Sequence, residues 1–388
     1  MLAQRISRLT SSLVRDILAA ASQPDVISFA GGLPAEDALF VPDAAGLAPE
    51  RLRAALQYGP SEGELRLREL VAQQLNSLGL SCGPQQVLIL NGSQQGIDLM
   101  AKLLIEPGRR VLVEAPAYLA ALQAFRLFGA ELDGWSRVEG ISAEAKMKEG
   151  LQADTCMTYL TPTFQNPSGA CYSAAERRGM AAVLDAHPGI VFEDDPYRDL
   201  AYDGPAPAPL VSHLRAARWV YQGSFSKILA PGLRLGFLVA HPELFPHLLR
   251  LKQAADLHSN RLSQLLVTQV LEDGLLAGHL ARILPDYRAR RDVMAASLDR
   301  HLGGLASWTL PAGGLFFWVK LAQPLDSQSL MQRMLRDERV AIMPGSAFFA
   351  QPADAAYLRL NFSHASPERI AEGLARLGRV LRSQRTAS

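Results

Sequence analysis

Short apolar runs alternate with longer stretches of helical periodicity between residues 87 and 240. The apolar runs are Val87–Leu90, 111–114, 156–160, Ile190–Asp194, 219–221 and Gly236–Ala240. One of the helical stretches begins at Ser173 with a capping box, because Glu176 follows three residues later. This alternation predicts βαβ units and a mostly parallel sheet that is covered by helices on both faces.

The pattern changes after residue 241. A long helical region runs to about residue 302, and we expect interruptions around Asn260 and at Pro285, since proline lacks the N–H that a helix interior needs. Strands then follow at 314–321, 340–343 and Tyr357–Asn361, with helices at 327–337 and 366–381. Mixed elements of this kind predict a smaller α+β unit.

We expect three regions in the 388 residues of the chain. Residues 1–45, a helix from about residue 11 followed by an extended segment, are too few for a domain and should pack with the C-terminal unit. Residues 46–285 would form the large domain and residues 286–388 the small one. A chain of this length buries about three quarters of its unfolded surface, so it needs no disulfides for stability.

Balanced charges narrow the possible functions. The chain has 39 Lys and Arg against 38 Asp and Glu, a formal net charge of +1. It therefore has no global field to attract nucleic acid or an anionic membrane. No apolar run approaches the roughly 20 residues that span a bilayer. Arg15 and Asp16 interrupt the apolar stretch near the N-terminus, which argues against an export signal.

Cysteines and histidines give no sign of a metal site. Cys82, Cys156 and Cys171 cannot form a full set of pairs, and no two of them have metal-ligand spacing. The eight histidines contain neither an HxxxH nor an HExxH pattern. These observations predict a reduced, cytoplasmic protein without a metal.

Only six of the 39 cations are lysines, and one of them has the surroundings of a nucleophile. Lys227 follows a strand and the small-residue turn GSFS at 223–226. Ligands of α/β sheets bind at the carboxyl ends of strands. Partial desolvation there would lower the pKa of Lys227 and supply the neutral amine. A structural charge in a turn is the alternative for Lys227 taken alone.

Two segments could hold a phosphate. Ser224 and Ser226 offer hydroxyl donors, and Arg234 offers a bidentate cation. The segment NGSQQG at 91–96 follows the first strand and opens a helix, where backbone N–H groups and the helix dipole favour an anion. An ordinary glycine turn capped by Ser93 is the alternative for this second segment.

Further polar and aromatic side chains follow the strands. Asp194 lies in a run of three acidic residues, which is costly to bury unless one faces a cation such as a protonated pyridine. Tyr197 can point its phenol at the same ring, Asn166 can donate to a phenolate oxygen, and Tyr118 offers an aromatic face. With the lysine and the phosphate cup, these groups match the parts of pyridoxal 5′-phosphate one for one.

On these residues, the sequence resembles the fold-type I pyridoxal-phosphate enzymes of the class I and II aminotransferase family. Within that family it is most similar to the branch of 2-aminoadipate and kynurenine aminotransferases. The similar segments run in family order: FAGGLP at 29–34, 58–68, GSQ at 92–94, NPSG at 166–169, DDPY at 194–197, SFSK at 224–227 and LRLNF at 358–362. The resemblance implies an α/β fold like that of aspartate aminotransferase, with a mostly parallel seven-stranded sheet in the large domain and a smaller α+β domain.

The resemblance also implies roles for individual residues. Lys227 would bind the cofactor covalently and move a proton, Asp194 would keep the pyridine nitrogen protonated, and Tyr197 would bond the 3-oxygen. The implied cofactor-binding set is Tyr58, Ser93, Gln94, Tyr118, Asn166, Asp194, Tyr197, Ser224, Ser226, Lys227 and Arg234.

Substrate and subunit contacts are implied in the same way. Arg359 resembles the arginine that binds the substrate α-carboxylate, with Gly32 and Asn166 beside it. Arg15 resembles a helix arginine that contacts substrate side chains, with a solvated helix charge as the alternative. Tyr58 resembles a tyrosine that reaches the phosphate of a neighbouring subunit, which implies a homodimer with shared sites.

The expected activity is transfer of an α-amino group from an amino acid to a 2-oxo acid, with 2-oxoglutarate as the expected acceptor, by a ping-pong cycle. A β-lyase or decarboxylase on the same fold is one alternative, because the reaction depends on which Cα bond stands perpendicular to the ring. A ligand sensor like the aminotransferase-like half of certain bacterial transcription regulators is another. Since the resemblance begins within the first 30 residues, we expect no DNA-binding region. The amino donor stays open.

Overall fold

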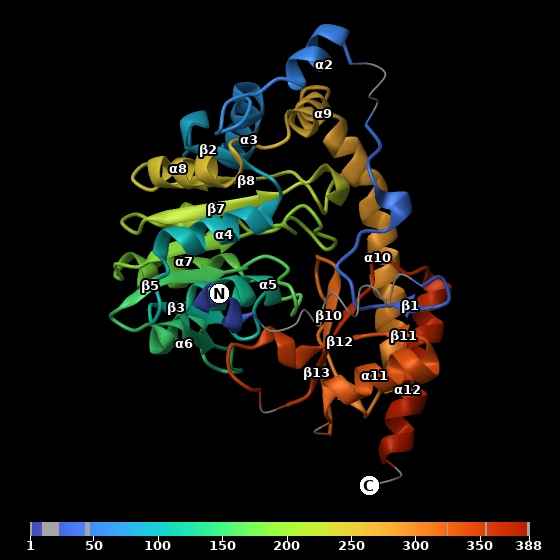
Figure 1. The fold of residues 1–388 in the computed structure, drawn as a ribbon. Coiled ribbons are helices and arrows are strands. Elements are labelled where there is room, and N and C mark those ends of the chain that lie inside the picture. Colours follow the sequence, from blue (N-terminus) through green and yellow to red (C-terminus); the bar gives the residue numbers. More distant parts are fainter. Residues whose placement is uncertain (1, 10–22, 43–46, 324, 354, 386–388) are drawn as a thin grey trace.

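A seven-stranded sheet forms the larger half of the molecule. In the computed structural model, which describes residues 2–9, 23–42, 47–323, 325–353 and 355–385, its strands lie in the order β2-β8-β7-β6-β5-β3-β4 (Figure 1). They are β2 (Val87–Leu90), β3 (Arg110–Glu114), β4 (Glu131–Trp135), β5 (Thr155–Leu160), β6 (Ile190–Asp194), β7 (Trp219–Ser224) and β8 (Gly236–Ala240). Strand β8 runs opposite to the other six strands of this sheet, which are parallel to one another. The predicted mostly parallel sheet is confirmed, and β4 is an edge strand that the apolar pattern did not reveal.

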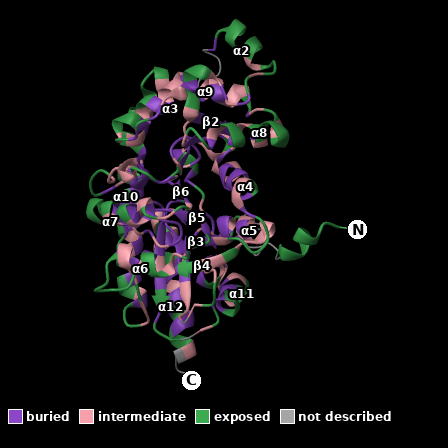
Figure 2. Ribbon diagram, turned by 90° about the vertical axis from the view of Figure 1, so that its left-hand side faces the viewer, coloured by how far each residue is buried: buried purple, intermediate pink, exposed green. Residues whose placement is uncertain are grey.

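Helices cover both faces of this sheet, as predicted. One face carries α4 (Ser93–Leu104), α5 (Leu119–Phe128) and α8 (Phe245–Asp256), and the other carries α6 (Ala143–Gly150) and α7 (Ala174–Asp185). In β6, Phe192 packs toward the first group and Val191 toward the second, because successive side chains of a strand point to opposite faces. Figure 2 shows β5 and β6 buried between these layers.

The region after β8 consists of α8, α9 (Arg261–Glu272) and α10 (Leu275–Leu302). The predicted break near Asn260 is confirmed, since its side chain caps α9 by accepting a hydrogen bond from Ser263 N at 2.9 Å. Two further α-helices, α2 (Pro49–Ala55) and α3 (Leu65–Ser77), precede the first strand of the large sheet. The described residues also form short 3₁₀ helices, which are η1 (Gln4–Arg8), η2 (Glu36–Ala38), η3 (Pro84–Gln86), η4 (Leu210–His213), η5 (Pro231–Leu233) and η6 (Gly345–Phe348).

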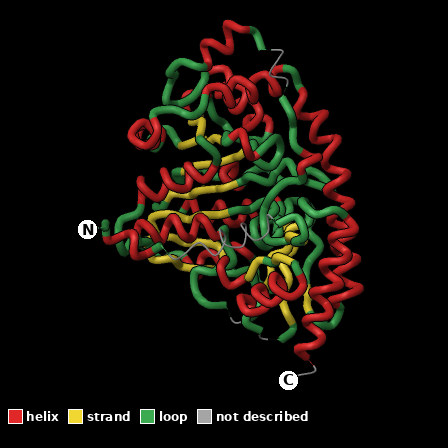
Figure 3. Tube along the Cα trace, turned by 45° about the vertical axis from the view of Figure 1, so that its right-hand side comes forward, coloured by secondary structure: helices red, strands yellow, loops and turns green. Residues whose placement is uncertain are grey.

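The predicted interruption at Pro285 is wrong, because α10 continues through this residue. Pro285 and Ala281, whose carbonyl loses its helical N–H partner, are both exposed, so water can replace the missing bond. Buried Ile283 and Tyr287 on the opposite side hold the helix in place. As a result, α10 runs along the molecule from the large sheet to the smaller one (Figure 3). The proposed domain boundary at 285/286 falls inside this helix and stays a prediction.

A smaller antiparallel sheet, in the order β12-β13-β10-β9, forms the C-terminal unit. Its strands are β9 (Ala306–Ser307), β10 (Phe316–Leu321), β12 (Met343–Pro344) and β13 (Tyr357–Asn361), and its helices are α11 (Ser327–Glu338) and α12 (Pro367–Arg385). The single strand predicted at 340–343 is wrong. Two short strands replace it, since the chain leaves β11 (Val340–Ala341) at Ile342 and enters a different sheet with β12.

Residues 27–29 of the N-terminal segment contact the C-terminal unit, whereas η1 lies against α5 of the large sheet. Strand β1 (Ile27–Ser28) pairs in parallel with β11, and Phe29 continues the contact, since its N–H donates to Ala341 O and its carbonyl accepts from Asn361 N, both at 2.8 Å. The helix predicted from residue 11 lies outside the described residues. None of the helices in the described ranges is long and apolar enough to cross a bilayer.

Candidate functional site

A pocket of about 450 Å³ opens where β5, β6 and β7 end. It brings together twelve of the predicted site residues: Gly32, Ser93, Gln94, Tyr118, Asn166, Asp194, Tyr197, Ser224, Ser226, Lys227, Arg234 and Arg359. Its other lining residues were not predicted from the sequence; they are Ala30, Gly31, Leu33, Thr161, Pro196 and Pro231. Thr161 directly follows β5, so its position after a strand could have revealed it.

One end of the pocket is a cup for an anion. Arg234 adopts a left-handed backbone conformation (φ +47°) directly after η5, and its guanidinium lies against the backbone of Gly92. Gly92 has φ +77°, a backbone conformation that favours glycine, and a Cβ there would also come within 2.5 Å of Arg234 Nη2. Gly92 precedes the first turn of α4, where Ser93 lies. The arginine therefore shares this end with the N-terminus of a helix, a combination that favours a phosphate.

Lys227 lies in the turn after β7. Its Nζ donates a hydrogen bond to Gly32 O at 2.7 Å. Burial, together with the nearby guanidinium groups of Arg359 and Arg234, lowers the pKa of Lys227 to about 8. A sizeable fraction of this amine is thus neutral near physiological pH, which a nucleophilic lysine requires.

Asp194 ends the central strand β6, and both of its oxygens accept a hydrogen bond. Gln222 Nε2 on β7 donates to Oδ1 at 2.8 Å, and Tyr159 Oη on β5 donates to Oδ2 at 2.7 Å. Burial raises the pKa of Asp194 to about 6, against the lowering effect of these two bonds. Neither donor was predicted from the sequence, although a polar side chain in an otherwise apolar strand is a usable signal.

Arg359 on β13 is connected to the other predicted groups. Its Nη1 donates to Asn166 Oδ1 at 2.9 Å, and its Nη2 bonds Ala30 O. Asn166 Nδ2 in turn lies 3.4 Å from Tyr197 Oη. The guanidinium lies over two aromatic rings, with Cζ 4.4 Å from the centre of Phe316 and 5.1 Å from that of Phe348. This arrangement fixes a cation within the pocket and can orient an incoming carboxylate.

The two neighbours of Asp194 in the acidic run have cationic partners away from the pocket. Glu193 accepts backbone hydrogen bonds from residues 210 and 211 and faces Arg177 at 3.8 Å. Asp195 pairs with Arg198 at 2.6 Å. Asp194 thus differs from both in having no cation of the chain as a hydrogen-bond or ion-pair partner among the described residues.

Two predicted residues are not in the pocket. Tyr58 lies on the surface with 77% of its area exposed, edge-on to the ring of His258. The carbonyl of Tyr58 accepts a hydrogen bond from Arg261 Nη1 at 3.0 Å. Arg15 lies outside the described residues.

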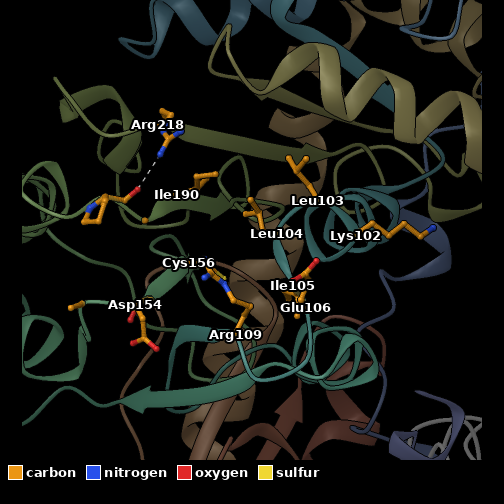
Figure 4. A pocket seen from close by; sticks show the side chains of 14 residues that line it. Lys102, Leu103, Leu104, Ile105, Glu106, Arg109, Asp154, Cys156, Ile190 and Arg218 are labelled. Carbon is orange, nitrogen blue, oxygen red and sulfur yellow. Dashed lines mark hydrogen bonds between the residues drawn. The ribbon is translucent and has the colours of Figure 1, made fainter. Parts of the chain in front are cut away.

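A second pocket, of about 630 Å³, lies at the opposite edge of the large sheet, where β5 and β6 begin (Figure 4). It includes Arg109, Asp154 and Arg218, and none of the predicted site residues. Twelve of the predicted site residues therefore lie in the pocket at the carboxyl ends of the strands, and none lies in this second pocket.

Comparison with known proteins gives consistent matches over the whole chain. The family described as aminotransferase class I and II matches residues 24–377. A 2-aminoadipate transaminase from Thermus thermophilus is 40% identical over 97% of this chain and 95% of its own length.

Two solved structures share this fold. One is an α-aminoadipate aminotransferase of Thermus thermophilus in complex with N-(5′-phosphopyridoxyl)-L-leucine, with a TM-score of 0.90, 36% identity and coverage of 100% of this chain and 98% of the other. The other is a kynurenine aminotransferase of Pyrococcus horikoshii in complex with PMP, with a TM-score of 0.90, 32% identity and coverage of 99% and 97%.

Proposed function

Because this chain belongs to the family of class I and II aminotransferases, we propose that its pocket holds pyridoxal 5′-phosphate between Arg234, Lys227 and Asp194. The predicted family, fold and cofactor are confirmed at the level of the family: the protein is a pyridoxal-phosphate-dependent aminotransferase. The roles of individual residues are our proposal.

One observation carries this assignment. A desolvated lysine, an anion cup and a buried carboxylate without a cationic partner among the described residues line a single pocket. Each group matches one part of the cofactor: the lysine matches the aldehyde, the anion cup the phosphate and the carboxylate the pyridine nitrogen. The carboxylate in particular is costly to bury, and a pyridinium would supply the missing positive charge.

The cofactor supplies an aldehyde that takes up the amino group and a protonated ring that accepts electrons from the substrate Cα. Lys227 Nζ, at the turn after β7, would take the proton from Cα and return it. Arg359 would bind the α-carboxylate and so fix the orientation of the Cα–H bond. Asn166 and Tyr197 would hydrogen-bond the 3-oxygen, and Tyr118 would cover one face of the ring.

The substrates are an amino acid and a 2-oxo acid. We propose 2-oxoglutarate as the acceptor. Relatives named for 2-aminoadipate, aromatic amino acids and kynurenine suggest the first donors to test. Whether Arg15 contacts the donor stays a prediction.

We also propose a homodimer in which Tyr58 serves the neighbouring site. Its position on the surface, away from the pocket of its own chain, supports this role. A cytoplasmic location, inferred from three free cysteines, is part of the same proposal.

Borohydride reduction tests the assignment directly. Protein saturated with pyridoxal 5′-phosphate is reduced, digested and analysed by mass spectrometry, and we expect the pyridoxyl group on Lys227. A label on another lysine, or no label, would refute the assignment. Loss of the cofactor's colour on adding each donor, and its return on adding a 2-oxo acid, then separates transamination from a lyase or decarboxylase reaction.

A further inference from the structure

We propose that Gln222 is a positioning residue for the cofactor-binding carboxylate, and that Gly96 is present to make room for it. This inference rests on the proposed role of Asp194. It concerns a buried amide and a helical glycine to which the site assignment above gives no role.

The amide of Gln222 is aimed at the carboxylate. Gln222 lies directly opposite Asp194 in the pairing of β6 with β7, and its Nε2 donates to Oδ1 at 2.8 Å. Both side chains are buried, with exposed fractions of 0% for Gln222 and 4% for Asp194. A hydrogen bond to an ionised group in such a setting is stronger than one between neutral groups.

The oxygen of the same amide does not explain why a polar side chain is present here. Gln222 Oε1 is buried and has no hydrogen-bond partner among the described residues. An unsatisfied buried oxygen is unfavourable, and an apolar side chain in β7 would avoid it. The amide is therefore explained by its donor end, which faces Asp194.

The helix above β7 is adapted to this amide. Gly96 lies within α4, on the face that packs onto the sheet, and a Cβ at this position would overlap with Gln222 Oε1. Glycine is less favourable than alanine inside a helix. This overlap explains the glycine, because any larger residue at position 96 would collide with the side chain of Gln222. We call residues 96 and 222 a matched pair.

Gln222 and Tyr159 together hold Asp194 from the two neighbouring strands, one donor on each oxygen. This fixes the plane of the carboxylate and favours its ionised form. A carboxylate fixed in this way is ready to pair with a protonated ring nitrogen, so Gln222 should act on the cofactor only through that pairing.

The test compares two cofactors. Apoprotein is titrated with pyridoxal 5′-phosphate and with its 1-deaza analogue, whose ring has a C–H in place of the nitrogen, and the ratio of the two Kd values is taken. Gln222→Met keeps the size of the side chain and removes the donor. We expect the wild-type protein to bind the natural cofactor more tightly than the analogue. In Gln222→Met this ratio of Kd values should be about tenfold smaller, because one hydrogen bond to a charged group contributes a factor of that size.

Tyr221→Phe is the matched control. It removes a buried hydrogen bond on the same strand, but one that goes to Asp195, and it should leave the ratio unchanged. An unchanged ratio in Gln222→Met, with a wild-type protein that does discriminate, would overturn the role of Gln222 alone. A wild-type protein that binds both cofactors equally would refute the role of Asp194, and this inference with it. Failure to bind either cofactor would refute the proposed function.

Thermal unfolding of the apoprotein tests the matched pair without cofactor. Gly96→Ala alone should lower Tm, because its methyl group meets Gln222. Adding Gln222→Leu should restore Tm while the cofactor preference stays reduced. If Gly96→Ala is neutral, or if the double variant is no more stable than the single one, residues 96 and 222 are not matched.

Discussion

Lys227 owes its reactivity to its surroundings. Burial and two nearby guanidinium groups lower its pKa to about 8 from the ordinary value of 10.5, so deprotonation of the free amine becomes half complete near pH 8. We predict that the rate at which apoprotein attaches pyridoxal 5′-phosphate covalently rises with pH and has its midpoint near that value. Stopped-flow absorbance measures this rate, and a midpoint near 10.5 would contradict the effect of burial.

Arg359 offers a planar group that a lysine cannot imitate. It is fixed by Asn166 and by the rings of Phe316 and Phe348. We predict that Arg359→Lys raises KM for the amino donor about tenfold or more, because bidentate binding of the carboxylate is lost. Steady-state kinetics with a fixed donor gives this value. An unchanged KM would assign the α-carboxylate to another group.

At the scale of elements, the carboxyl ends of β5, β6 and β7 depend on a buried ion pair behind the pocket. Arg177 on α7 is fully buried and donates to the carbonyl oxygens of Tyr172 and Pro162, both at 2.9 Å, while facing Glu193. We predict that Arg177→Met lowers the free energy of unfolding by about 3–5 kcal/mol, because an uncompensated carboxylate remains. Urea unfolding measures this loss.

The neighbouring Arg178 supplies the control, since it lies exposed on the same helix. Arg178→Met should change stability by less than about 0.5 kcal/mol.

Burial and Asp195 raise the pKa of Glu193 to about 7, against the lowering effect of Arg177. In Arg177→Met this carboxyl takes up a proton more readily when folded than when unfolded, so the loss of stability should be greater at pH 9 than at pH 6. Equal losses at both values would rule out Glu193 as the cause.

At the scale of the whole molecule, Tyr58 and Lys227 of one chain lie in different places. Tyr58 is exposed on the surface, whereas Lys227 lines the pocket. If Tyr58 serves the partner's site, a heterodimer of a Tyr58→Phe chain and a Lys227→Ala chain contains one complete site and one doubly impaired site. We predict about half of the wild-type turnover for purified heterodimers. The Lys227→Ala homodimer should be inactive, and the Tyr58→Phe homodimer should bind cofactor about tenfold more weakly.

Two outcomes would contradict this arrangement. A heterodimer no more active than half of the Tyr58→Phe homodimer, measured at limiting cofactor, would place both residues in the same site. A monomer in sedimentation velocity would remove the shared site altogether.

The sequence by itself determined the layered sheet and most of the pocket. Apolar strands and the turns after them are local features, and parallel strands bring their carboxyl ends to one edge, so Lys227, Asp194 and Asn166 could be placed together in advance. Tertiary structure alone decided what depends on packing between distant segments. Three features are of this kind: α10 continues through Pro285, residues 340–343 are divided between two sheets, and Gln222 contacts Asp194 next to Gly96. No local pattern encodes such contacts, because their energy exists only when the distant segments meet.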